Sequence, residues 1–149
     1  MKRTKLTIEI PGIPVTANHA VGHTRNGRGY KTPKYANWVN RVNRAKLGKI
    51  KYSDWYRFDI ELYFSIYNKS HKVPDRSLFE TVRDFYLTCQ ARIKRKDTSN
   101  YIKYAEDVIF QRLKTYEGIK LDDKQIIQGS YKKIDSEEEK TKIIIHCVS

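Results

Sequence analysis

The chain has 149 residues, in which 30 Lys and Arg outweigh 17 Asp and Glu to give a formal net charge of +13. This length accommodates one hydrophobic core, so we expect a single domain over 1–149 rather than two. Two cysteines, Cys89 and Cys147, are too few for a zinc site or a disulfide framework, and no segment approaches the about 20 apolar residues of a membrane span. We therefore expect a cytoplasmic protein with no membrane partner, a description that also fits a phage or prophage protein.

The positive charge is concentrated in the N-terminal part of the chain. Thirteen basic residues but only two acidic ones, Glu9 and Asp54, precede Phe58. A one-sided positive field favours a polyanionic partner, because each Lys or Arg near a phosphate releases condensed counterions. Nucleic acid is the first candidate, although charge alone does not indicate catalysis.

The first part of the chain predicts a strand, a loop and a helix. Apolar and polar residues alternate over 6–10, which is the period of a half-buried strand, and Pro11 and Gly12 end it. The segment 13–33 is basic and punctuated by glycine, which predicts a loop. Residues 34–47 then have the apolar spacing of a helix.

The second part predicts helices and further strands. Alternation is strongest over 55–67, which predicts a strand. Apolar residues have a helical spacing over 77–89, where the aromatic content leaves a strand open, and again over 99–114. Two more strands are predicted at 125–134 and 141–148. The fold class is therefore α+β, with a mixed β-sheet of about four strands and roughly two or three helices.

A group of acids stands out in this basic chain. Hydrolysis of a phosphodiester needs carboxylates that concentrate a divalent cation, which activates water and neutralises developing charge. At about 100° per residue, Asn100, Lys103 and Asp107 share one face of the helix predicted over 99–114. Asp97 lies at the start of this helix, and the acidic pair at 122–123 follows in a loop that can fold back onto it.

Each of these residues also has a purely structural interpretation. Asp97 or Ser99 is suited to capping the helix, and Lys103 with Asp107 forms an i,i+4 pair worth about 0.3 kcal/mol on a solvated face. The pair at 122–123 fits an acidic turn. A chance helix rarely combines a capping acid, an amide, a lysine and an aspartate on one edge, so the combination favours a catalytic site.

Three segments carry a specific pattern. They read K-D-T-S-N-Y-I-K at 96–103, E-D at 106–107 and G-I-K-L-D-D-K-Q-I at 118–126. They resemble the motifs D-x-D-N-x-x-K, D-A-L and G-V/I-x-x-D-D-x-x-I of the RusA-type Holliday junction resolvases. Further similarity at 12–18, 30–32, 132–133 and 141–145 extends the resemblance over most of the chain.

The resemblance implies a RusA-like fold and a small homodimer that uses magnesium, with manganese as a substitute, to make paired symmetric incisions in four-way DNA junctions. By this resemblance Asp97 and Asp123 would be metal ligands, and Asp122 and Asp107 supporting acids. Lys103 would be the cation that stabilises the pentacoordinate phosphate. Two opposed nicks also call for two sites related by a two-fold axis.

One residue departs from the family pattern. Ser99 stands where the second acid of D-x-D is expected, and a serine is a neutral and weaker ligand. Either another carboxylate is recruited to the metal, with Asp107 and Glu106 the nearest candidates, or the metal is bound less tightly.

Basic residues before and around the predicted site are candidates for contacts with DNA phosphates, since Arg and Lys on a flexible backbone can follow a duplex without reading its bases. They are Arg25, Arg28, Lys31, Lys34, Lys94, Arg95 and Lys96. Two alternatives remain open at this point, a non-catalytic DNA-binding protein of architectural or regulatory type and an RNA-binding protein of ribosomal type. Dependence on a divalent metal and a preference for four-way junctions distinguish the resolvase from both.

Overall fold

A computed structural model describes residues 2–16, 20–65 and 99–148 of the chain. Its main element is a four-stranded sheet of order β1-β8-β5-β7, in which β8 pairs antiparallel with β1 and β5, while β5 and β7 run parallel. The sheet is therefore mixed, and the predicted α+β class is confirmed. The strands are β1 (Lys5–Pro11), β5 (Trp55–Ser65), β7 (Ile126–Ser136) and β8 (Lys140–Val148).

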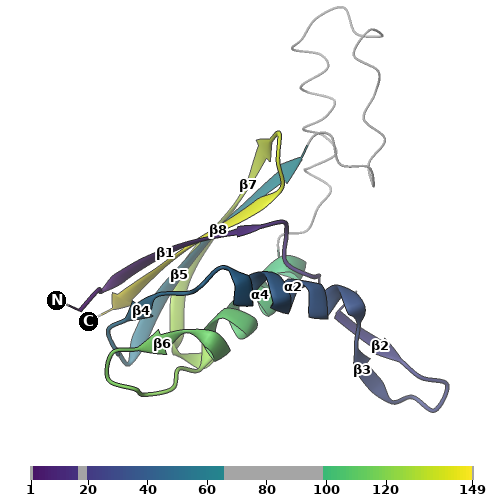
Figure 1. The fold of residues 1–149 in the computed structure, drawn as a ribbon, viewed down its shortest axis with the longest axis horizontal. Helices are drawn as coiled ribbons and strands as arrows, with labels where there is room; N and C mark the ends of the chain where they lie inside the picture. The colour runs from purple at the N-terminus through teal and green to yellow at the C-terminus, as the bar shows by residue number, and fades with distance from the viewer. Residues whose placement is uncertain (1, 17–19, 66–98, 149) are drawn as a thin grey trace, which may run out of the picture.

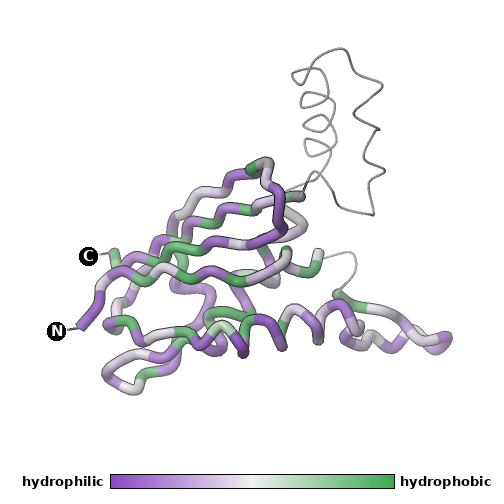
Figure 2. The backbone as a smooth tube through the Cα atoms, turned by 45° about the horizontal axis from the view of Figure 1, so that its top comes forward, coloured by the Kyte–Doolittle hydropathy of each residue, from purple (hydrophilic) through white to green (hydrophobic). Residues whose placement is uncertain are grey.

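Two helices, α2 (Pro33–Arg44) and α4 (Ser99–Arg112), lie together on one side of this sheet (Figure 1). The strand residues that alternate toward them are buried, and the tube in Figure 2 alternates accordingly between hydrophobic and hydrophilic colours. The ring of Phe110 in α4 packs edge to face against Tyr56 of β5 and at a tilt against Phe58. The ring centroids are 5.7 and 6.1 Å apart, respectively. The core thus lies between the helical layer and the facing side of the sheet.

The ends of α2 follow from local chemistry. The hydroxyl of Thr32 accepts a hydrogen bond from the backbone N–H of Tyr35 at 3.3 Å, and Pro33 occupies the first turn, where it needs no donor. The helix was predicted to continue to residue 47 but ends at Arg44. Lys46 adopts a left-handed backbone with φ of 51°, which breaks the helical path before Gly48 is reached.

The segment 13–33 is not a loop throughout, because it contains a hairpin of β2 (Val21–His23) and β3 (Gly29–Lys31). This hairpin projects from the body of the molecule beyond α2 (Figure 1). Gly27, with φ of 78°, donates to the carbonyl of Thr24 at 2.9 Å and turns the chain. Strands of three residues are too short to show a period of two, which is why the sequence did not reveal them.

A second small sheet joins the ends of the two helices to the body. β4 (Lys49–Ile50) pairs in parallel with β6 (Lys114–Thr115), so α4 ends at Arg112 rather than at residue 114 as predicted. The helix predicted over 77–89 and the last two residues of the strand predicted over 55–67 lie outside the described residues. Within the described ranges, no helix has the length and apolar character needed to cross a membrane.

Candidate active site

The polar face of α4 carries two of the predicted site residues. Tyr104, Ala105 and Val108 are buried, so Lys103 is left exposed and Asp107 half-buried on the opposite side of the helix. Asp107 Oδ1 accepts a hydrogen bond from Gln111 Nε2 at 3.1 Å. Within the described part of the chain, Lys103 makes no ion pair with Asp107. An i,i+4 ion pair therefore does not explain the presence of these two residues.

The acidic pair begins a short 3-10 turn, η2 (Asp123–Gln125), that follows the β6 strand. Asp122 is its N-cap, and its Oδ1 accepts from the backbone N–H of Lys124 at 2.9 Å. In return, Gln125 Oε1 accepts from the N–H of Asp122 at 2.8 Å, which completes a capping box. The turn therefore fixes the backbone from which both carboxylates extend.

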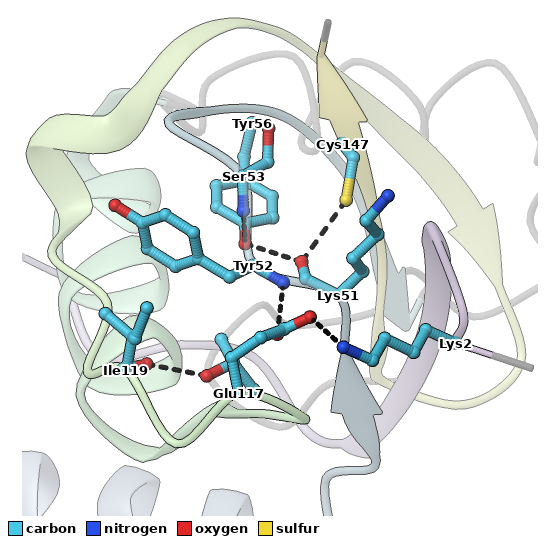
Figure 3. Close-up of polar contacts among 9 residues, drawn as sticks. Lys2, Lys51, Tyr52, Ser53, Tyr56, Glu117, Ile119 and Cys147 are labelled. Carbon is cyan, nitrogen blue, oxygen red and sulfur yellow. Dashed lines mark hydrogen bonds and ion pairs between the residues drawn. The ribbon is translucent and has the colours of Figure 1, made fainter.

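Long-range hydrogen bonds fasten this acidic turn to the segment before β5. Gln125 Nε2 donates to the carbonyl of Ser53 at 3.0 Å. Earlier in the same loop, Glu117 accepts from the backbone N–H of Tyr52 and from Lys2 Nζ, both at 2.8 Å (Figure 3). Two anchors, one on each side of the acidic pair, thus set its position relative to the sheet.

Four carboxylates from the two segments act on one another electrostatically. The neighbouring carboxylate of Asp122, together with partial burial and the charge of Asp107, raises the pKa of Asp123. Burial and the charge of Asp123 raise the pKa of Glu106. The hydrogen bond from Lys124 instead lowers the pKa of Asp122. The turn η2 packs against α4, so Asp123 lies near enough to Glu106 and Asp107 for their charges to influence one another.

The chemistry of this group suits a divalent cation. Mg²⁺ prefers carboxylate oxygens, and a cation would relieve the mutual repulsion that raises the pKa values of Asp123 and Glu106. Among residues 2–16, 20–65 and 99–148, no three potential ligands lie close enough together to form a complete site. Asp97, which was predicted as a ligand, lies outside the described residues, as do Lys94, Arg95 and Lys96.

Basic side chains lie on the hairpin and at the start of α2. Lys31 Nζ lies 4.6 Å from the ring centroid of Tyr35 and 5.1 Å from that of Tyr104. The two rings meet edge to face, with centroids 5.5 Å apart. Arg25 and Arg28 lie in the exposed turn of the hairpin, and Lys34 is exposed in the first turn of α2. The described basic candidates thus lie along the hairpin and at its junction with α2.

The sequence interpretation missed the residues that hold the acids in place. Gln111, Glu117 and Gln125 make the hydrogen bonds described above, and none of them was predicted. The spacing of Asp122 and Gln125, D-x-x-Q, is that of a capping box and could have been recognised. The contacts to Tyr52 and Ser53 have no local signal because they span more than sixty residues.

Neighbouring carboxylates that can bind a divalent cation, together with an exposed lysine, are groups that metal-dependent hydrolysis of a phosphodiester uses. A comparison with protein families matches residues 11–146 to the family described as Endodeoxyribonuclease RusA. The chain therefore belongs to the RusA endodeoxyribonuclease family, hydrolases that act on phosphodiester bonds and resolve Holliday junctions. A comparison with curated proteins finds no match.

Proposed function

We propose that this chain resolves four-way DNA junctions by paired symmetric nicks that depend on magnesium, with manganese as a substitute, and that it acts in DNA recombination and repair. The observation that supports this is the meeting of acids from two separate segments. Glu106 and Asp107 come from α4, whereas Asp122 and Asp123 come from the turn after β6, and their charges affect one another. Lys103 lies one helical turn before Asp107 on the same polar face.

We assign the roles from this arrangement and from the family motifs. Asp97, Asp107 and Asp123 would hold the cation, which when bound supplies an activated water and neutralises charge on the transition-state oxygens. Asp122 would support Asp123 through their contact. Lys103 would neutralise the pentacoordinate phosphate, since its ammonium is exposed on the polar face of α4.

We propose that the arms of the DNA junction bind the basic surface of the hairpin and the start of α2. Arg25 and Arg28 at the hairpin turn, with Lys31 and Lys34 at its base, would contact phosphates without reading bases. The run 94–96 would extend this surface next to Asp97. Because two opposed nicks need two sites, we propose that the active form is a homodimer.

The decisive experiment compares a labelled synthetic four-way junction with a matching linear duplex, each incubated with the protein in magnesium or in EDTA. The expected result on a denaturing gel is a pair of symmetric nicks in the junction that EDTA abolishes. Tight junction binding without cleavage in magnesium or manganese would show instead that Ser99 marks a lost active site.

Two substitutions test the ligand assignment. Asp97→Asn and Asp123→Asn should each abolish cleavage while junction binding persists, because the charge of a carboxylate rather than its shape holds the cation. Glu138→Gln, in the exposed turn between β7 and β8, is the matched control that removes an acid elsewhere. Loss of junction binding together with cleavage would contradict the assigned roles.

A further inference from the structure

A hollow of about 800 Å³ lies between the C-terminal ends of α2 and α4 and the chain that follows α4. Its apolar lining includes Val42 and Leu113, which are buried, and Leu47, which is partly exposed. Ile119 also lines it, and 48% of this residue remains exposed. Leu47 and Ile119 therefore supply the apolar surface that is open to solvent, and such a surface can bind an apolar side chain from another molecule.

The rim of the hollow is cationic. Its charged lining residues are all basic, namely Lys49, Arg112, Lys114 and Lys120. In the described part of the chain, no ion pair engages any of these four side chains, and Arg112 instead donates to Asn43 Oδ1 at 2.7 Å. A cation in the last turn of a helix compensates the helix dipole, which accounts for Arg112. That explanation does not extend to Lys49 and Lys120, which lie outside the helices.

The exposed Ile119 is held in place by an ordered turn. Its carbonyl accepts a hydrogen bond from the buried hydroxyl of Thr115 at 2.7 Å. Gly118, with φ of 74°, donates to the carbonyl of Thr115 at 3.2 Å and gives the turn its shape. Glu117, the acid nearest in sequence, is turned toward Lys2 and Tyr52 and does not line the hollow. The turn therefore presents an apolar side chain beside unpaired positive charge.

A DNA ligand would not use both the cationic rim and the apolar surface of the hollow. A duplex is convex and would place phosphates on the rim lysines without using the apolar floor. An unpaired base would need an aromatic side chain to stack on, and none is present among the described residues that line the hollow. An acidic peptide that carries an apolar side chain matches both features, since its carboxylates meet the lysines while the side chain enters the floor.

We propose that this hollow is a docking site for a partner protein, which binds through an acidic segment that carries large aliphatic side chains. The contact would recruit the nuclease at a surface that adjoins its acids, because Gln111 lines the hollow and also donates a hydrogen bond to Asp107 at 3.1 Å. Ile119 is the apolar contact, and Lys114 and Lys120 are the charged contacts. Occupancy of the site leaves the basic hairpin free for DNA.

The test measures fluorescence anisotropy of a labelled octapeptide, GDEDLEDL, on the full-length protein. A second peptide replaces both leucines by serine, and a third replaces every acid by its amide. The first peptide should bind at least roughly fivefold more tightly than either control, because each control lacks one of the two features that the hollow would recognise, the leucine side chains or the negative charge. Equal binding of the leucine and serine peptides would overturn the proposal, since it would leave only unspecific attraction to the lysines.

Three variants locate the contact. Ile119→Ser should weaken binding of the leucine peptide without changing the charge of the protein, and Lys114→Glu should weaken it by roughly threefold to fivefold. Lys132→Glu, an equal charge reversal on an exposed position of β7, should have a smaller effect than Lys114→Glu. Thermal unfolding of each variant confirms that it is folded. If Ile119→Ser leaves the peptide affinity unchanged, or lowers the affinity for a four-way junction instead, the hollow is not a peptide site.

Discussion

Lys31 and Lys103 approach the same aromatic ring, with their ammonium nitrogens 5.1 and 5.3 Å from the ring centroid of Tyr104. One lysine ends the second strand of the basic hairpin, and the other belongs to the polar face of α4. Tyr104 itself is buried, and its carbonyl accepts a hydrogen bond from Trp38 Nε1 at 3.3 Å. A fixed aromatic ring thus links the proposed DNA-binding surface to the proposed catalytic lysine.

Replacing this ring should therefore affect catalysis. We expect Tyr104→Leu to lower the rate of junction cleavage by roughly fivefold or more, because each cation–π contact contributes about 0.5–1 kcal/mol and two are lost. Tyr104→Phe keeps the ring and should retain most of the activity. Single-turnover cleavage with saturating protein measures the effect, and urea unfolding corrects for lost stability. An equal loss in the two variants would show that the hydroxyl, rather than the ring, is what matters.

Gln125 is expected to position the acidic turn for metal binding. Gln125→Ala removes the two hydrogen bonds of this side chain, to the N–H of Asp122 and to the carbonyl of Ser53. The loss should lower the free energy of unfolding by about 1 kcal/mol. We also expect cleavage to need more magnesium for half-maximal rate, since Asp122 and Asp123 are then less well ordered.

The matched variant is Gln125→Glu. It retains an acceptor for the N–H of Asp122 but loses the donor to Ser53, so its magnesium requirement should lie between those of the wild type and Gln125→Ala. A magnesium titration of the initial rate checks the order. If Gln125→Ala loses stability but keeps the wild-type magnesium dependence, the residue has a structural role alone.

Much of the fold could be predicted because its elements carry clear periods. The alternation over 6–10 and 55–67 identified β1 and β5, and the three- and four-residue spacing after Ser99 identified α4. The short pairs β2–β3 and β4–β6 could not be predicted, since strands of two or three residues have no period and depend on tertiary contacts.

The residues of the candidate site could be proposed from the sequence, but the contacts that position them could not. The motif spacing predicted Asp107, Asp122 and Asp123 as site residues, and the helical period predicted that Lys103 and Asp107 share one face of α4, where the structure has them. The electrostatic influence of Asp123 on Glu106, and the hydrogen bond from Gln125 to Ser53, arise only when distant segments pack together. Long-range hydrogen bonds depend on the tertiary structure and leave no signal in the local spacing of residues.

Ser99 offers a direct test of the departure from the family motif. Ser99→Asp restores the second acid of D-x-D, and we expect it to lower the magnesium concentration for half-maximal cleavage, because a charged ligand binds a hard cation more tightly than a hydroxyl does. Ser99→Ala is the control and should not lower it. The measurement is a magnesium titration of the cleavage rate for each variant. An unchanged titration in Ser99→Asp would indicate that Glu106 or Asp107 already supplies the missing ligand.

Tyr56 should make the stability of the fold depend on pH in the alkaline range. Its side chain is fully buried, donates to the carbonyl of Lys51 at 2.8 Å and accepts from the N–H of Ser53 at 2.9 Å. Burial raises the pKa of Tyr56 to about 12 from an ordinary value of 10.0. Because the folded state holds this proton more tightly than the unfolded chain, the contribution is complete below pH 10 and is lost as the pH rises toward 12.

The size of this contribution is about 2–3 kcal/mol, from roughly two pKa units at 1.36 kcal/mol each. Urea unfolding between pH 8 and pH 12 should show the loss, and Tyr56→Phe isolates it from the deprotonation of lysines that occurs in the same range. The variant should be less stable by about 1–2 kcal/mol at pH 8, where two hydrogen bonds are missing, yet should lose less stability above pH 10. Parallel pH profiles for the two proteins would mean that the Tyr56 phenol ionises at its ordinary pKa in the folded state.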